Sequence, residues 1–230
     1  MTIAISRWQL PPRNLQLSAG QVDLWRYRLD IDSENDLTLG KDLSADEFAR
    51  ADKLKIPKKH RQFIVARAGL RKILASYLKV RAAEITFSYD EKGKPALAEN
   101  ISRLDFNLSH SETLAVLAVT QSGAVGVDVE DIDDTADFYP VAERYFNRQE
   151  FAALAAVPGP RQRRAFYRLW TRKESLLKML GVGLSVGPET ISSASETPTR
   201  SVYISRHSLA AITASFEITS INRYQLTEIE

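Results

Sequence analysis

The chain has 230 residues, 44% of them hydrophobic and 26% charged, and carries a formal net charge of +2. This length allows one sizeable core or two small ones, and no uninterrupted apolar stretch is long enough to cross a bilayer. The absence of cysteine excludes disulfides, cysteine-bound zinc and thiol catalysis, and no signal-peptide pattern opens the chain. We therefore expect a globular protein of the cytoplasm without membrane segments.

The first half of the sequence predicts several strands and two helices. Ser44 with Glu47 three residues later forms a capping box that opens a helix through Ala51. Pro57 then allows a second, longer helix from about Lys58 to Leu78, which carries an apolar stripe. Strands are predicted at Val22 to Leu29, Ile85 to Tyr89, Asp105 to Leu108, Leu114 to Val119 and Ala124 to Glu130.

The second half predicts helices followed by strands. The helices, around Pro140 to Ala155 and from Arg161 to Leu180, are separated by a Pro-Gly-Pro segment that no helix traverses. The predicted strands are Val202 to Ile204, Ala211 to Ile218 and Tyr224 to Leu226.

The order of elements is similar in the two halves of the chain. We therefore predict an α+β fold made of a pseudo-twofold pair of subdomains, each a small, mostly antiparallel sheet packed with helices. The predicted boundary gives an N-terminal half at residues 1–124 and a C-terminal half at residues 125–230.

Two segments place carboxylates where chemistry is expected. Asp128 and Glu130 alternate with valines, so a strand puts both carboxylates on one face, and Glu174 lies one helical turn before Lys178. Three carboxylates would repel one another unless a cation lay among them. Because no histidine spacing resembles a zinc site, we expect Mg²⁺ shared with a phosphorylated substrate.

Each of these features also has an ordinary structural explanation. An Asp-x-Glu strand is often a solvated face, and a Glu–Lys pair at this spacing is often a surface ion pair that contributes about 0.2 to 0.5 kcal/mol. The buried-looking apolar runs at residues 114–119 and 124–129 favour a functional site. Carboxylates are costly to place at the end of a buried strand, so their presence there indicates a role.

Five segments in one order resemble the 4′-phosphopantetheinyl transferases, in particular the monomeric type that activates peptide and polyketide synthetases. The resemblance covers about residues 58–184, and the ends of the chain show no motif of the family. The segments are a helix bearing Arg61, Arg67 and Arg71, then Gly93 to Pro95 (GKP), Phe106 to Ser111 (FNLSHS), Gly126 to Glu130 (GVDVE) and Trp170 to Lys178 (WTRKESLLK).

The resemblance implies transfer of the 4′-phosphopantetheine arm of coenzyme A to a serine of an apo acyl or peptidyl carrier protein, with release of adenosine 3′,5′-bisphosphate. It implies that Asp128, Glu130 and Glu174 bind Mg²⁺. Glu174, directly or through a water, is then the expected base, and Lys178 is expected to stabilise the charge that develops on the phosphates.

The resemblance also assigns contacts to coenzyme A. Lys94 and Pro95 are expected along the adenine, Ser109 and His110 at a phosphate, and Arg61, with or without Arg67, at the 3′-phosphate. Structural explanations compete here too: Pro95 can start a strand after a turn, His110 can be a capped loop histidine, and the arginines one helical turn apart can both be structural.

The alternatives are a non-catalytic module that binds coenzyme A or a carrier protein, and a metal-dependent nuclease. The four-residue spacing of Glu174 and Lys178 argues against the nuclease, so no nucleic-acid partner is expected. The basic helices suit docking of an acidic carrier protein. The acidic loop from Asp131 to Asp137 opposes that attraction or offers a further metal ligand. We expect a monomer, because two fused halves build the site without a second chain.

Overall fold

The protein is an α+β fold, described here by a computed structural model for residues 7–30, 40–99, 102–183 and 197–227. The predicted fold class is confirmed. No helix in these ranges combines the length and the apolarity that a membrane span requires. In chain order the elements are β1 (Gln21–Arg28), α2 (Ala45–Ala51), α3 (Pro57–Leu78), the 3-10 helix η2 (Ala82–Glu84), β2 (Phe87–Tyr89), β3 (Pro95–Leu97), β4 (Asp105–His110), β5 (Leu114–Thr120), β6 (Val125–Asp131), α4 (Tyr139–Tyr145), α5 (Arg148–Ala155), α6 (Gly159–Leu180), β7 (Thr199–Tyr203), β8 (Ser208–Ala214) and β9 (Ser220–Gln225).

The two halves of the chain repeat one topology. The first sheet has the strand order β4-β5-β1-β9 and the second has the order β6-β8-β7. In each half a first strand leads into helices, which are followed by an antiparallel hairpin whose second strand pairs antiparallel with the first strand. The orders β4-β5-β1 and β7-β8-β6 therefore correspond, as the predicted pseudo-twofold pair requires.

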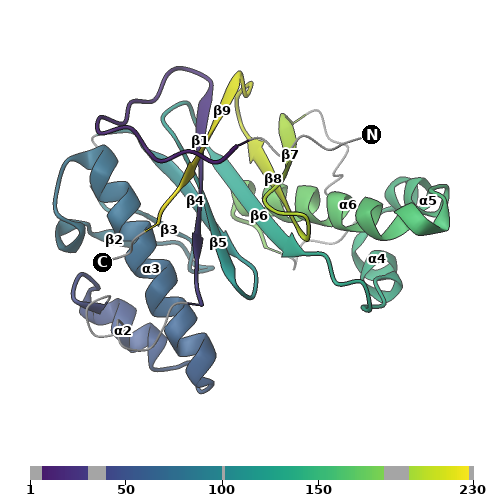
Figure 1. Ribbon diagram of the computed structural model, residues 1–230, viewed down its shortest axis with the longest axis horizontal. Helices are drawn as coiled ribbons and strands as arrows, with labels where there is room; N and C mark the ends of the chain where they lie inside the picture. Colours follow the sequence, from purple (N-terminus) through teal and green to yellow (C-terminus); the bar gives the residue numbers. More distant parts are fainter. Residues whose placement is uncertain (1–6, 31–39, 100–101, 184–196, 228–230) are drawn as a thin grey trace.

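The two sheets face each other, with a long helix on each outer side (Figure 1). Apolar residues of β1 and β5, such as Leu24 and Val116, pack against Val127 and Ile212 of the second sheet. The other face of the first sheet packs on α3, through residues that include Phe106. Helix α6 packs on β6 and β8. The N-terminal end of β6 thus lies between the first sheet and α6.

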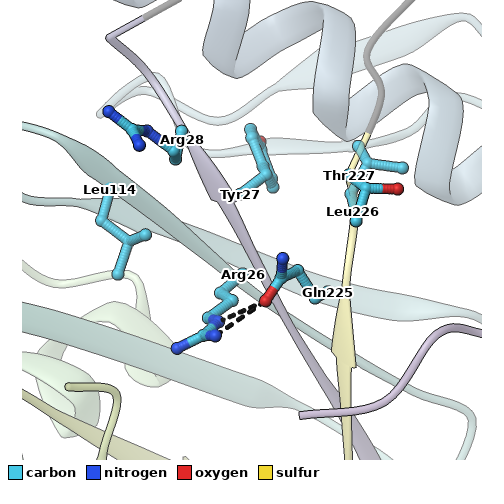
Figure 2. Close-up of a pocket in the computed structure, with 7 residues that line it drawn as sticks. All are labelled: Arg26, Tyr27, Arg28, Leu114, Gln225, Leu226 and Thr227. Carbon is cyan, nitrogen blue, oxygen red and sulfur yellow. Dashed lines mark hydrogen bonds between the residues drawn. The ribbon is translucent and has the colours of Figure 1, made fainter.

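Strand β9 crosses the predicted boundary between the halves. It comes from the C-terminal part of the chain but pairs in parallel with β1 of the first sheet (Figure 1). Figure 2 shows the end of these two strands, where the guanidinium of Arg26 donates to Gln225 Oε1 from Nη2 at 2.7 Å. The division at residues 124 and 125 stays a prediction, and β9 is an exception to it.

Several predicted element boundaries were wrong. The helix expected around residues 140–155 is two helices, because Asn147 accepts a hydrogen bond from the amide of Glu150 and caps a new helix, α5. Helix α6 begins earlier than expected, at Gly159, since Pro160 falls in the first turn where its missing N–H costs nothing. The strand expected at Ala211 to Ile218 lies instead at Ser208–Ala214.

Candidate active site

Strand β6 and helix α6 are in close contact at Gly126. A Cβ built on this residue would lie 2.1 Å from the carbonyl oxygen of Ser175 and 2.4 Å from the amide nitrogen of Met179. A glycine is therefore needed for this approach of helix to strand. Asp128 and Glu130 follow Gly126 on the same face of β6, and Glu174 and Lys178 each precede one of the two contacted residues on α6. The sequence-predicted carboxylates and lysine are thus brought together.

Lys178 connects the helix to two strands. Its Nζ donates to Asp128 Oδ1 at 2.6 Å and to Ser109 Oγ at 2.8 Å. The Ser109 hydroxyl in turn donates to the same oxygen of Asp128 at 3.1 Å. Asp128 is 4% exposed, and its second carboxylate oxygen is buried with no partner among the described residues. A buried anionic oxygen without a donor is costly, so it marks a place for a positively charged ligand.

The two glutamates of the site have raised pKa values. Burial raises the pKa of Glu174 to about 7, and the negative charges of Asp128 and Glu130 add to the shift while Lys178 opposes it. Burial also raises the pKa of Glu130, again with a contribution from Asp128. The three carboxylates therefore repel one another across a desolvated space, which a cation would relieve.

The donor set fits a hard divalent ion. All the candidate ligands are carboxylate oxygens, which Mg²⁺ prefers. Within the described ranges no group of three or more acidic, histidine or cysteine side chains is arranged to hold a metal ion by itself, so the protein alone supplies an incomplete cage. An incomplete cage is typical of Mg²⁺, which is usually bound by one or two carboxylates together with water and substrate phosphates. The unpartnered Asp128 oxygen and the mutual repulsion of the carboxylates both support this fit.

Trp170 holds Glu130, a contact that sequence reasoning missed. Its indole Nε1 donates to Glu130 Oε1 at 3.1 Å. The ring also packs near Tyr145 and Phe166, so its apolar body belongs to the core between α4 and α6. The helical spacing predicts that the Trp170 ring packs in the core. A buried indole N–H also needs a hydrogen-bond acceptor, and this need was the signal in the sequence that a polar partner lies nearby.

Two of the predicted coenzyme A contacts, Lys94 and Pro95, line a cavity of about 300 Å³ together with Glu174 and Lys178, whereas Ser109, His110, Arg61 and Arg67 are not among its lining residues. Lys94 and Pro95 come from the β2–β3 hairpin, and Glu174 and Lys178 from α6. Lys94 Nζ donates to the carbonyl oxygen of Lys178 at 2.8 Å, so the hairpin reaches the C-terminal end of α6. Pro95 is the first residue of β3, which agrees with its structural explanation and leaves its place in the cavity intact.

The arginines of α3 have different surroundings. Arg67 is 5% exposed and donates to Glu47 and to the hydroxyl of Tyr89. Arg71 donates to the other oxygen of Glu47 at 2.7 Å. These buried contacts favour a structural role for both residues, because removing either partner would leave an uncompensated charge. Arg61 lies in the second turn of the helix and is partly exposed.

His110 ends β4 beside the site. One ring nitrogen, Nδ1, lies 3.2 Å from the carbonyl oxygen of Ser111. Desolvation lowers the pKa of this histidine, and the positive charges of Lys178 and Lys59 lower it further. Two lysines that act on one histidine indicate a positively charged neighbourhood, which suits a phosphate.

Acidic side chains at the end of β6 and in the loop after it accept hydrogen bonds from nearby residues. Asp133 accepts from the amide and hydroxyl of Thr135, and Asp131 accepts from the hydroxyl of Ser208 at 2.6 Å. Arg163 Nη1 donates to the carbonyl oxygens of Asp133 and Ala136. These contacts give the carboxylates of Asp131 and Asp133 partners other than Asp128, Glu130 and Glu174.

Comparisons with known proteins agree with this arrangement. The sequence model of the 4′-phosphopantetheinyl transferase superfamily matches residues 124–227, and that of the N-terminal domain of 4′-phosphopantetheinyl transferases matches residues 33–122. The chain is 38% identical over 180 residues to the 4′-phosphopantetheinyl transferase HetI of Nostoc sp.. The matched region covers 77% of this chain and 76% of that relative. The chain is 32% identical over 147 residues to psf-1 of Bacillus pumilus, covering 63% of this chain and 60% of the relative. It is 41% identical over 93 residues to AcpT of Escherichia coli, covering 40% and 47%.

Proposed function

We propose a metal-assisted mechanism for this chain, which belongs to the 4′-phosphopantetheinyl transferase family and is such an enzyme. Enzymes of this family transfer phosphopantetheine to carrier proteins. In the proposed reaction a serine hydroxyl of the apo carrier protein attacks the β-phosphate of coenzyme A. A new serine–phosphate ester forms, the bond to the α-phosphate breaks, and adenosine 3′,5′-bisphosphate leaves.

Asp128, Glu130 and Glu174 are the proposed ligands of Mg²⁺. The ion would neutralise charge on the pyrophosphate of coenzyme A when it is bound. The observation that carries this assignment is the buried Asp128 oxygen that has no donor among the described residues, beside two glutamates whose pKa values are raised by burial and further by the charge of Asp128. Trp170 keeps Glu130 oriented toward the same space.

Glu174 is the proposed acceptor of the serine proton. Its pKa of about 7 would suit a general base that works near neutral pH. A bound cation would lower this pKa and weaken the base, so transfer of the proton through a water is the easier route. Lys178 is the group proposed to stabilise charge on the phosphates, and the contacts of its Nζ with Ser109 and Asp128 support this proposal.

The cavity between the β2–β3 hairpin and α6 is the proposed site for coenzyme A. Lys94 and Pro95 would lie along the adenine, and Ser109 and His110 would contact a phosphate. Arg61 is the better candidate for the 3′-phosphate, because Arg67 is buried and already donates to Glu47. The monomeric state and the cytoplasmic location remain predictions.

The test is intact-mass spectrometry of a purified apo carrier protein incubated with the enzyme, coenzyme A and Mg²⁺, with an EDTA control. We expect a metal-dependent gain of one phosphopantetheine on the carrier. Transfer that is unchanged by EDTA would refute the metal role. No gain on several carrier types, despite measurable coenzyme A binding, would favour the non-catalytic module.

A further inference from the structure

Alternate side chains of β4 accept hydrogen bonds from main-chain amides of β6. The three acceptors differ in chemistry, being a carboxylate, an amide oxygen and a hydroxyl, but they share one face of β4. We call these three contacts the side-chain ladder. They join the amide of Val125 to Asp105 at 2.7 Å, that of Val127 to Asn107 at 2.9 Å and that of Val129 to Ser109 at 3.4 Å.

The ladder replaces a strand pairing that the two sheets do not make. Strand β6 pairs with β8 on one side only, and β4 is the edge strand of the first sheet. The remaining amides of β6 are buried, and buried amides need acceptors. Side-chain oxygens of β4 supply them, so one of the polar contacts between the two halves runs along this line, beside the apolar contact between the sheets.

The ladder holds the main chain on both sides of Asp128. Val127 and Val129 flank this carboxylate, and both of their amides are bonded to β4. At Ser109 the ladder reaches the carboxylate itself, because the hydroxyl that accepts from Val129 also donates to Asp128 Oδ1. Asn107, at the centre of the ladder, is 6% exposed. The position of β4 in the first half of the chain therefore helps to fix the position of the Asp128 carboxylate in the second half.

We propose that Asn107 is a positioning residue for the transfer reaction. By holding the Val127 amide it fixes Asp128 relative to Ser109 and Lys178, without itself contacting the reacting phosphate. The proposal rests on the proposed function for its kinetic readout only. Its structural readout, the protection of a single amide, is measured without any substrate, so a failure of the transfer reaction and a failure of the ladder are distinguishable.

The test compares Asn107→Leu, which keeps the branched shape and the number of side-chain heavy atoms but removes the acceptor, with Asn107→Asp, which keeps an acceptor oxygen at the same reach. For Asn107→Leu we expect kcat to fall about 10- to 100-fold, with a smaller change in the KM for coenzyme A. Hydrogen exchange of the Val127 amide, followed by NMR, should become faster in this variant. Asn107→Asp should restore the Val127 protection and most of kcat.

Two results would overturn the proposal. The first is wild-type kcat and unchanged Val127 protection in Asn107→Leu. The second is a rise confined to KM, which would make Asn107 a coenzyme contact, since it also lines the cavity. If Asn107→Leu fails to fold, Asp105→Ala replaces it, because Asp105 begins the ladder. A lower kcat with faster exchange of the Val125 amide supports the proposal, and wild-type values for both refute it.

Discussion

Replacing Gly126 by alanine tests whether the close approach of β6 and α6 creates the site. The new Cβ would lie 2.1 Å from the carbonyl oxygen of Ser175, whereas ordinary contact begins at 3.4 Å. The helix must therefore retreat by roughly 1.3 Å, or the strand must bend by as much. Both contacted atoms belong to the helix backbone, so no flexible side chain can absorb the change.

Two opposing effects decide whether this substitution stabilises or destabilises the fold. Alanine restricts the unfolded chain and is favoured over glycine within a strand, which alone would stabilise the fold by about 0.5 to 1 kcal/mol. Overpacking against a rigid helix costs about 1 to 3 kcal/mol, so a net destabilisation is expected. A displacement on the order of 1 Å would also lengthen the 2.6 Å contact between Lys178 and Asp128 and reduce kcat by up to about 100-fold.

Urea unfolding and the rate of carrier modification measure the two consequences. Gly159→Ala is the matched control, because a Cβ there meets no atom within 4 Å and the residue begins the same helix. The control should keep the wild-type rate and, because its Cβ meets no obstacle, gain up to about 0.5 to 1 kcal/mol of stability. Increased stability with full activity in Gly126→Ala would refute the reasoning, because it would mean that intrinsic propensity outweighs the helix contact.

Three further predictions concern single residues. Glu174→Gln should abolish transfer while the protein stays folded by circular dichroism, because the amide can neither bind the cation as a carboxylate nor take the proton; full activity would remove Glu174 from both roles. Lys94→Ala should raise the apparent KM for coenzyme A more than it changes kcat in steady-state assays, and a pure loss of kcat would contradict a binding role. Burial raises the pKa of Asp23, against hydrogen bonds from Tyr77, Gln21 and Asn222, so the folded protein retains a proton that the unfolded chain releases. The free energy of unfolding should therefore fall as pH rises from 3.8 toward the raised pKa, and urea unfolding across pH should show a flatter profile for Asp23→Asn; an equal slope in both proteins would exclude Asp23 as the source.

Local patterns predicted most of the elements but not all of their partners. Capping residues and apolar periodicity located α2, α3 and α6, because these signals act within a few residues of the chain. The split between α4 and α5 was missed because Asn147 interrupts an otherwise helical pattern through a single side-chain bond. Periodicity likewise indicates that β9 is a strand but carries no information about pairing with β1.

In the candidate site, too, local residue patterns were predicted, whereas contacts with distant residues were not. The carboxylates of β6 and the Glu–Lys pair of α6 were visible as residue types at meaningful spacings, and the structure places them together through Gly126. The contact of Arg67 with coenzyme A stays a prediction, and its structural partner, Glu47, lies twenty residues earlier and could not be identified from the helix alone. The ladder was hidden for another reason, because its donors are main-chain amides, which every residue type except proline carries.

The pairing of β9 with β1 sets the order in which the chain can complete its fold during synthesis. Strand β1 emerges early, but one of its two neighbours, residues 220–225, is roughly 200 residues later. At ordinary translation rates of about 5 to 20 residues per second, that edge of β1 waits for roughly 10 to 40 seconds. Meanwhile this edge of a strand in which half of the residues are apolar is open to other chains. The nascent protein therefore depends on its last strand to protect its first.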